Sequence, residues 1–284
     1  MKRIAYQGEP GSNSDAACQI FTPDREAKPY PTFAHVFDAL LNGEVEEAMV
    51  PVENAVAGRV DDIYRLLPEH PIGIVSEYFL PIKMHLMALP GADPKGLKYV
   101  RTHPMALGQC ASAITRHGLL AEAARDTAGA ARELKENPDM AVAVIAPEIA
   151  ADHYGLQIVE RDVQDIERNY TRFLRLTKDG AEEWPDLLSG PILTSMIFKV
   201  RNIPSALYKA MGGFATNGVN MIKLESYQED ANFTSTRFHA EIEGHPDDPS
   251  VRRALEELGY FTEYMKLLGV YPADAYRANH AFKS

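Results

Sequence analysis

The stretch Arg168-Asn169-Tyr170-Thr171-Arg172-Phe173 runs directly into Leu174-Arg175-Leu176-Thr177, where apolar and polar residues alternate. Alternation with a period of two is typical of a β-strand. The stretch therefore places an amide, a hydroxyl and a guanidinium at the start of a predicted strand. A guanidinium can bind a planar anion through two hydrogen bonds, and a threonine hydroxyl can both donate and accept one. We interpret the stretch as part of an anion site; the alternative is a solvated turn that opens an edge strand.

Polar turns of a similar kind recur upstream, between predicted strands and predicted helices. A first strand at Arg3–Gln7 leads into the glycine-rich turn Gly8–Ser14, and an apolar strand from Ala48 leads into Glu53 and Asn54. Helix N-termini attract anions, and open α/β sheets bind ligands at the carboxyl ends of their strands. Asn54 can equally be a turn or helix-cap residue, and Glu53 a structural carboxylate.

The second half of this region repeats the pattern. Thr102-His103-Pro104 and Asp126-Thr127 each precede a predicted helix, and His103 can serve as a cap or as an acid or base. The apolar run Met140–Ile145 is typical of a central strand that is buried on both faces. Helices at Phe33–Leu41 and Asp61–Leu67, and strands at Ile72–Glu77 and Ile82–Leu89, complete the pattern. We expect two α/β lobes with a cleft between them that binds a small anion.

The pattern changes beyond a predicted linker at Ala181–Asp186. It reads as a strand, helix, strand, strand, helix and strand, at Thr194–Val200, Pro204–Thr216, Asn220–Ser226, Ser235–Glu243, Pro249–Leu258 and Thr262–Val270. This β-α-β-β-α-β order predicts a ferredoxin-like module. Because such a small sheet exposes its edges, we expect it to pair with a second copy. The chain after Tyr271 gives no clear pattern.

Composition limits the classes of function. The net charge of -11, without a basic run, argues against nucleic acid as a partner, so an anion must be bound by a local group of donors. The two cysteines, Cys18 and Cys110, have no metal-ligand spacing, and we expect buried free thiols and no metal. Because the N-terminus resembles no signal peptide and no apolar run could span a membrane, we expect a cytoplasmic protein.

These motifs, in this order, resemble the monofunctional prephenate dehydratases. The resemblance rests on Val50-Pro51-Val52-Glu53-Asn54 with Gly58, on Thr102-His103-Pro104 with Gln109-Cys110, on Tyr154-Gly155-Leu156, and on Asn169 with Thr171-Arg172-Phe173. It implies a two-lobed catalytic domain like a type II periplasmic binding protein at residues 1–180, and an ACT regulatory domain at residues 191–272. It also implies conversion of prephenate to phenylpyruvate without a cofactor, and feedback regulation by L-phenylalanine.

The resemblance assigns roles to particular residues. It implies that Thr171 is catalytic, with substrate-binding residues at Ser12, Glu53, Asn54, Thr102, Gln109, Thr127, Asn169, Arg172 and Phe173. The corresponding phenylalanine-binding residues are Ser205, Ala206, Leu207, Asn220, Glu225 and Ser226. A homodimer or homotetramer that pairs through ACT domains is also implied.

The sequence departs from the family pattern at several positions. Ala55 replaces a usual Ser or Thr, Pro147 replaces a Ser found in many members, and the family's G-A-L motif begins with Ser205. Tyr227-Gln228 replaces Arg-Pro in the E-S-R-P motif, which bears on phenylalanine binding. Arogenate as the substrate, or a non-catalytic amino-acid sensor on the same scaffold, are the alternatives. A periplasmic solute-binding protein is disfavoured because no signal sequence is recognised.

Overall fold

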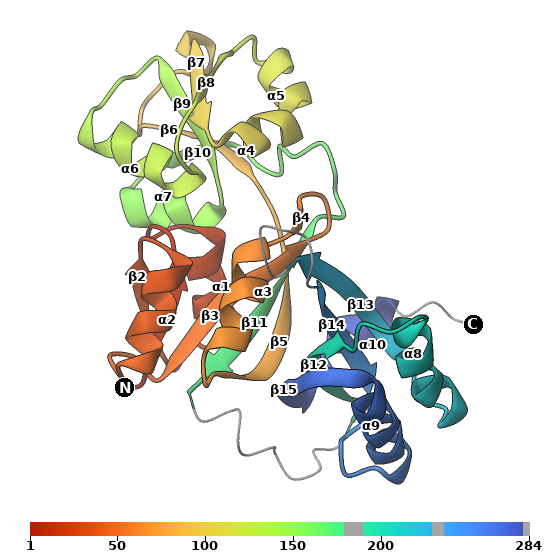
Figure 1. Cartoon of the computed structure of the whole chain (residues 1–284). Helices are drawn as coiled ribbons and strands as arrows, with labels where there is room; N and C mark the ends of the chain where they lie inside the picture. Colours follow the sequence, from red (N-terminus) through yellow and green to blue (C-terminus); the bar gives the residue numbers. More distant parts are fainter. Residues whose placement is uncertain (179–189, 229–235, 281–284) are drawn as a thin grey trace. The chain divides into compact units, whose positions relative to one another are not determined.

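The computed structural model describes residues 1–178, 190–228 and 236–280 (Figure 1). Contacts divide the chain into two compact units. The first contains residues 1–60 and 79–173, and the second contains residues 61–78 and the chain from residue 174 onward. Strands β5 (Gly73–Pro81) and β11 (Tyr170–Thr177) contribute residues to both. The predicted linker at 181–186 lies outside the described residues, and the predicted domain bounds stay predictions.

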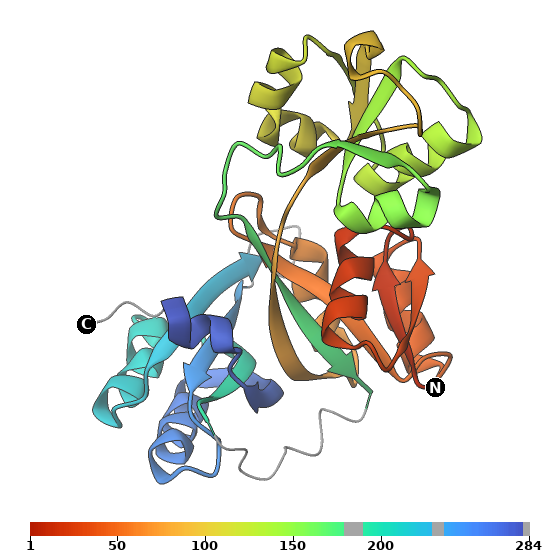
Figure 2. The same cartoon turned by 180° about the vertical axis from the view of Figure 1, so that it is seen from behind.

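The first sheet of the first unit is built from parallel strands joined by helices. Strands β1 (Arg3–Gln7), β2 (Glu26–Tyr30) and β3 (Glu47–Asn54) have the order β3-β1-β2, and β11 lies beside β3 (Figures 1 and 2). Helix α1 (Asn13–Phe21) joins β1 to β2, and α2 (Phe33–Leu41) joins β2 to β3. The bounds predicted for β1 and α2 are confirmed. Short strand β4 (Gly58–Arg59) folds back antiparallel to the end of β3.

A second sheet belongs to the same unit and has the order β10-β6-β9-β7-β8. Its strands are β6 (His85–Ala88), β7 (Tyr99–Thr102), β8 (Leu120–Ala123), β9 (Val142–Ala146) and β10 (Gln157–Glu160). The accompanying helices are η1 (Pro94–Gly96), α4 (Pro104–Gln109), α5 (Ala111–Arg116), α6 (Thr127–Glu136) and α7 (Glu148–Tyr154). Every residue of β9 is buried, which confirms the prediction of a central strand covered on both faces.

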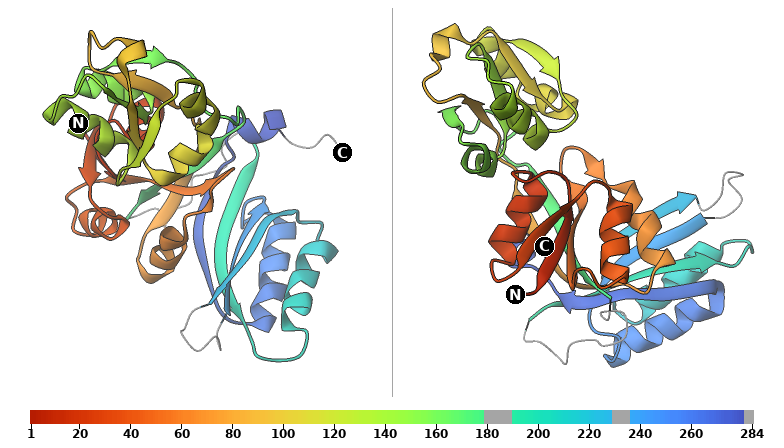
Figure 3. Two further views of the ribbon diagram at one scale, coloured as in Figure 1. Left: turned by 90° about the horizontal axis from the view of Figure 1, so that it is seen from above. Right: turned by 90° about the vertical axis from the view of Figure 1, so that its left-hand side faces the viewer.

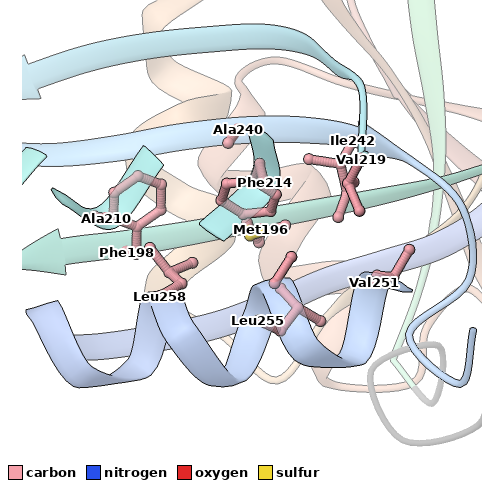
Figure 4. Close-up of a cluster of buried hydrophobic side chains, with 11 residues drawn as sticks. Met196, Phe198, Ala210, Phe214, Val219, Ala240, Ile242, Val251, Leu255 and Leu258 are labelled. Carbon is pink, nitrogen blue, oxygen red and sulfur yellow. The ribbon is translucent and has the colours of Figure 1, made fainter. Parts of the chain in front are cut away.

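The second unit contains the predicted β-α-β-β-α-β module. Its elements are β12 (Ile192–Val200), α8 (Ala206–Thr216), β13 (Met221–Gln228), β14 (Thr236–Glu243), α9 (Pro249–Phe261) and β15 (Thr262–Pro272). The strand order β13-β14-β12-β15 is antiparallel throughout, as a ferredoxin-like module requires. Helices α8 and α9 cover one face of this sheet (Figure 3), and Phe198, Phe214 and Leu258 pack in the core between the layers (Figure 4).

Residues before and after the module also belong to the second unit. Helix α3 (Asp61–Glu69) contacts the sheet through Tyr64, whose hydroxyl lies 3.0 Å from Lys223 Nζ. Strand β5 pairs in parallel with β15, with Ile74 opposite Gly269. A Cβ atom on Gly269 would lie 2.3 Å from the Ile74 carbonyl oxygen, so only glycine permits this approach. The segment after β15, for which no element was predicted, forms α10 (Ala275–His280).

Some elements differ from the sequence predictions for identifiable reasons. Strand β2 was not predicted, because Glu26-Ala27-Lys28-Pro29-Tyr30 is polar and contains a proline, a residue that strands tolerate at a sheet edge. Helix α8 begins at Ala206 rather than Pro204, because Ser205 has a left-handed backbone with φ of 61°. The short elements β8, β10 and α7 were also missed, since each spans too few residues to show periodicity.

Candidate active site

Asn54 is the centre of a hydrogen-bonded cluster at the end of β3. Its side-chain oxygen accepts hydrogen bonds from the backbone N–H groups of Val56 (3.0 Å) and Ala57 (2.7 Å). This local turn is a common use of asparagine, because its carboxamide can replace a backbone acceptor. Gly58, with φ of 84°, lets the chain reverse into β4. The orientation of the Asn54 amide is therefore fixed by its own loop.

The nitrogen of the same amide reaches residues more than a hundred positions further along the chain. Asn54 Nδ2 donates to Asn169 Oδ1 at 2.7 Å and to Thr171 Oγ1 at 2.9 Å, with the Tyr170 carbonyl oxygen at 3.3 Å. The backbone reinforces this junction, because the Ala55 N–H donates to the Tyr170 carbonyl at 2.9 Å. The structure thus brings together Asn54, Asn169 and Thr171, all of which the sequence predicted as site residues.

The cluster is largely shielded from solvent. Asn169 is 3% exposed, Thr171 8% and Arg172 3%. Phe173 is buried in the core at 1% exposure, while Glu53 is half-buried beside Asn54. Polar groups hydrogen-bond more strongly when water is excluded, so this is a place where a fixed donor can influence a developing charge.

The remaining predicted substrate-binding residues lie elsewhere in the first unit. Ser12 is the N-cap of α1 and accepts from the Asp15 N–H at 3.3 Å. Thr102 is completely buried, and its hydroxyl donates to the Ile145 carbonyl at 2.6 Å. Gln109 is half-buried at the end of α4, and Thr127 begins α6 behind the capping carboxylate of Asp126. In the described residues no hydrogen bond joins these four to the Asn54 cluster, and their substrate-binding roles stay predictions.

The turn between β1 and α1 makes contacts that the sequence did not reveal. The Asp15 carboxylate accepts from the Gly11 N–H at 2.8 Å and lies 2.9 Å from His153 Nε2 on α7. The Tyr154 hydroxyl donates to the Pro10 carbonyl at 2.7 Å. A Cβ atom on Gly11 would lie 3.0 Å from Ala150 Cα, so glycine permits close packing against α7. No local signal predicts pairs so distant in sequence.

Two hollows in this unit lie away from the Asn54 cluster. One of about 570 Å³ is lined by Tyr6, Asp15, Arg25 and His153 among others. Another of about 340 Å³ is lined by residues that include Lys83, His85 and Glu148. Neither hollow is lined by Asn54, Asn169 or Thr171, so the candidate site is defined by the hydrogen-bonded cluster and not by either hollow.

The two thiols are not candidates for nucleophilic chemistry. Burial raises the pKa of Cys110 to about 12, and burial together with nearby Asp15 raises the pKa of Cys18 well above its usual range. Both are buried free thiols, as predicted. Within residues 1–178, 190–228 and 236–280, no group of three or more His, Cys, Asp or Glu side chains could hold a metal ion. In the same ranges, no helix has the length and apolar character to cross a membrane.

The predicted effector residues lie at two places in the second unit. Ser205, Ala206 and Leu207 open α8, and Ser205 has the strained backbone described above. After the C-terminal end of α8, the Asn220 amide donates to Glu243 at 3.0 Å, and on β13 Glu225 lies 3.4 Å from Lys223 Nζ. Ser226 is exposed on β13. Their role in phenylalanine binding stays a prediction.

Comparison with known proteins bears on the Asn54 cluster directly. The prephenate dehydratase family profile matches residues 4–181, a range that contains every member of the cluster. The chain belongs to the prephenate dehydratase family. Its α/β fold with two sheets is that of the solved prephenate dehydratases.

Members of the prephenate dehydratase family similar to this chain include proteins with more than one activity in their names. A bifunctional N-acyl-homoserine lactone acylase/prephenate dehydratase of Komagataeibacter europaeus is 42% identical over 96% of this chain and 97% of that protein. The chloroplastic arogenate dehydratase/prephenate dehydratase 2 of Arabidopsis thaliana is 36% identical over 96% of this chain and 73% of that protein.

Solved structures extend the similarity over nearly the whole chain. A quorum quenching acylase superimposes with a TM-score of 0.89 and 41% identity, covering 97% of this chain and 100% of its own. The prephenate dehydratase of Arthrobacter aurescens in complex with L-Phe gives a TM-score of 0.85 and 26% identity, covering 95% of this chain and 89% of its own.

Proposed function

We propose that this protein is a prephenate dehydratase that converts prephenate to phenylpyruvate, carbon dioxide and water in L-phenylalanine biosynthesis. The observation that carries the proposal is the hydrogen-bonded Asn54–Asn169–Thr171 cluster, which lies within the residues matched by the family profile. The residue types in the cluster are neutral hydrogen-bond donors and acceptors, which suit a reaction that requires help for a departing oxygen.

The chemistry defines what the protein must supply. The bond between the ring and its carboxylate breaks, its electron pair enters the ring, and the ring hydroxyl departs with the electrons of its own C–O bond. The departing oxygen gains negative charge and takes up a proton to become water. Formation of the aromatic ring drives the reaction, so the protein needs chiefly to hold the substrate and to stabilise the departing oxygen.

Thr171 is the residue to which we assign that stabilisation. A threonine hydroxyl is a poor acid near neutral pH, so a hydrogen bond that strengthens as charge develops describes its role better than full proton transfer. A donor of this kind is worth roughly 3–4 kcal/mol in the transition state. Because the protein has a net charge of -11, the substrate carboxylates require local donors. We assign that anchoring to Arg172 and Ser12.

The test measures the ultraviolet absorbance of phenylpyruvate after enzyme and prephenate are mixed, with the uncatalysed rate subtracted. Thr171→Val keeps the side-chain shape and removes the hydroxyl, so we expect kcat to fall by roughly two to three orders of magnitude with KM within a few-fold. Thr171→Ser is the matched control and should retain most of the activity. An unchanged kcat in Thr171→Val contradicts the assignment. Replacing prephenate with arogenate distinguishes the alternative substrate, and inactivity on both leaves the sensor alternative.

The β-α-β-β-α-β module supports a regulatory role in the same proposal. We assign it as an ACT domain that binds L-phenylalanine and pairs with a second copy, in a homodimer or homotetramer. Support comes from the Arthrobacter aurescens relative, whose structure is in complex with L-Phe, and from the strained Ser205 at the start of α8, since strain of this kind gathers at ligand sites. Equilibrium dialysis of the full-length protein with labelled L-phenylalanine tests the assignment, and absence of saturable binding contradicts it.

A second activity has a separate basis. The relative from Komagataeibacter europaeus is named as an N-acyl-homoserine lactone acylase as well as a prephenate dehydratase, and its similarity spans nearly the full length of both proteins. We therefore propose N-acyl-homoserine lactone acylase activity as a second candidate function, and the test measures release of homoserine lactone from an N-acyl-homoserine lactone. Release that persists in Thr171→Val identifies an activity independent of the dehydratase site, and absence of release leaves the monofunctional expectation. The expected cytoplasmic location remains an expectation.

A further inference from the structure

The hydrogen-bonding capacity of Asn54 is fully used inside the cluster. A primary amide has two N–H donors and one carbonyl acceptor. The Asn54 oxygen already accepts from two backbone N–H groups, and its nitrogen faces three acceptors: Asn169 Oδ1, Thr171 Oγ1 and the Tyr170 carbonyl. No donor of this amide remains for a ligand, although the sequence predicted Asn54 as a substrate-binding residue. Its geometry is that of a group that orients its neighbours.

The first neighbour is Thr171. Its oxygen accepts the hydrogen bond from Asn54 Nδ2 at 2.9 Å. A hydroxyl has one proton and two lone pairs, so a lone pair held by Asn54 turns the proton of Thr171 away from the amide. Asn54 therefore presents the threonine as a donor, which is the role that a departing, negatively charged oxygen requires.

The second neighbour is Asn169, and the same argument applies to it. Its side-chain oxygen accepts from Asn54 Nδ2 at 2.7 Å, which turns its own NH₂ group away from Asn54. Among residues 1–178, 190–228 and 236–280, no hydrogen bond from Asn169 Nδ2 is found, although the side chain is only 3% exposed. This nitrogen is not among the fully buried unpaired atoms of the described residues, so it reaches the accessible surface, where a ligand or water can accept from it.

We propose that Asn169 is a second catalytic donor beside Thr171, and that Asn54 is the positioning residue that turns both donors toward the substrate. The two oxygens that Asn54 holds lie within hydrogen-bond distance of one nitrogen, so the two donors are neighbours. Their common target is a substrate oxygen that gains negative charge, which under the proposed function is the leaving hydroxyl. This inference rests on the proposed function.

The first test replaces Asn169 with aspartate, which keeps an oxygen for Asn54, exchanges the NH₂ donor for a second oxygen and adds a negative charge. We expect Asn169→Asp to lower kcat by roughly two to three orders of magnitude, as for the loss of one oxyanion donor, and its added charge should also raise KM for the substrate carboxylates. A kcat within a few-fold of wild type overturns the assignment of Asn169. Wild-type turnover of prephenate is measured beside it, so failure of the proposed function is recognised separately as an inactive wild type.

The second test, Asn54→Asp, examines the positioning role. The new carboxylate still accepts hydrogen bonds from the Val56 and Ala57 N–H groups, but it now also accepts hydrogen bonds from the Thr171 hydroxyl and the Asn169 amide, so both donors turn inward. We expect kcat to fall by at least roughly a hundredfold at pH 8. Because these hydrogen bonds stabilise the charged carboxylate, its pKa stays low and the loss of kcat should persist between about pH 5 and pH 8.

A residue that served only the fold would lower kcat by the same factor in wild type and in Thr171→Val, whereas a positioning residue should have a smaller effect once the Thr171 hydroxyl is absent. Equal factors in the two backgrounds therefore overturn the positioning role. Circular dichroism and thermal melting compare the folded state of each variant with wild type. If Asn54→Asp fails to fold, Asn54→His, with a neutral ring N–H in place of the amide, provides the second measurement: we expect partial activity, and full activity overturns the role.

Discussion

Arg277 provides a stability prediction that follows from a contact invisible in the sequence. Its guanidinium, on α10, binds the Glu77 carboxylate through two hydrogen bonds of 2.6 and 2.9 Å, and it lies 3.7 Å from Glu241 Oε2. The Glu77 side chain is completely buried and that of Glu241 is 1% exposed, whereas Arg277 is 29% exposed. The Asp274 N–H also donates to Glu77, at 3.1 Å. The tail of the chain therefore supplies a cation to two buried carboxylates.

Arg277→Met keeps much of the side-chain volume and removes this cation. Breaking a buried ion pair from one side costs about 3–5 kcal/mol, because a buried charge loses its partner. Since Arg277 is itself partly exposed, we expect a value near the lower end, about 3 kcal/mol. For a protein of this size, that corresponds to a decrease in Tm of roughly 6–12 °C in the transition that includes the second unit. Activity measured well below that transition should change little.

The assay compares thermal and urea unfolding of Arg277→Met with those of Arg161→Met. Arg161 pairs with Glu148 at 2.7 Å, but both side chains are more than half exposed, at 58% and 54%. A surface pair of this kind contributes about 0–1 kcal/mol. The double variant Arg277→Met/Glu77→Gln removes both charges and should recover part of the loss, which isolates the pair energy. Equal destabilisation in Arg277→Met and Arg161→Met would refute the reasoning.

Three further predictions address packing, titration and the role of a buried hydroxyl. Gly269→Ala should destabilise the folded protein by roughly 3 kcal/mol, at the upper end for overpacking, because the new Cβ would lie 2.3 Å from the Ile74 carbonyl oxygen. The control Gly212→Ala, whose Cβ would meet no atom within 4 Å, should leave stability in urea unfolding unchanged or slightly raised. Burial lowers the pKa of His85 below its ordinary 6.5, so the unfolded chain binds a proton more readily than the folded chain and stability falls as the pH drops below that value. The urea midpoint of His85→Gln, measured between pH 5 and pH 8, should therefore decrease less toward low pH than that of wild type. Thr102→Val should lower the free energy of unfolding by about 1–2 kcal/mol, because the lost hydroxyl donates a hydrogen bond to the Ile145 carbonyl. The KM for prephenate should not change, and a raised KM would favour the predicted substrate contact.

Local patterns in the sequence predicted the elements that carry strong periodicity or clear caps. The strand Arg3–Gln7, the helix Phe33–Leu41 and the β-α-β-β-α-β order were read correctly, because alternation, helical spacing and proline or glycine at helix ends are local signals. Strand β2 and helix α10 were missed, since the first is polar and the second is short and held by Arg277. Contacts across long stretches of chain determine such elements, and no window of sequence contains them.

The candidate site shows the same division between local and long-range information. Its residue types were predicted from motifs, but the hydrogen bonds between Asn54, Asn169 and Thr171 depend on β3 and β11 being neighbours in the sheet. Topology also separates two kinds of predicted residue: Thr171 accepts from another site residue, whereas the Thr102 hydroxyl donates to the backbone of β9. Both are buried threonines after or within strands, and nothing in their neighbouring residues distinguishes them.

Ala55 shows how the main chain can retain a contribution that a side chain lacks. Family members usually carry a hydroxyl at this position. Because alanine lacks one, the loop can hold the site only through other hydrogen bonds. The Ala55 N–H donates to the Tyr170 carbonyl oxygen at 2.9 Å, and Asn54 Nδ2 approaches the same oxygen at 3.3 Å. The Ala55 side chain is exposed, so a hydroxyl there would be paired with solvent or ligand rather than with the cluster. The link between the β3–β4 turn and Thr171 therefore depends on backbone geometry and the Asn54 amide, both of which alanine leaves intact.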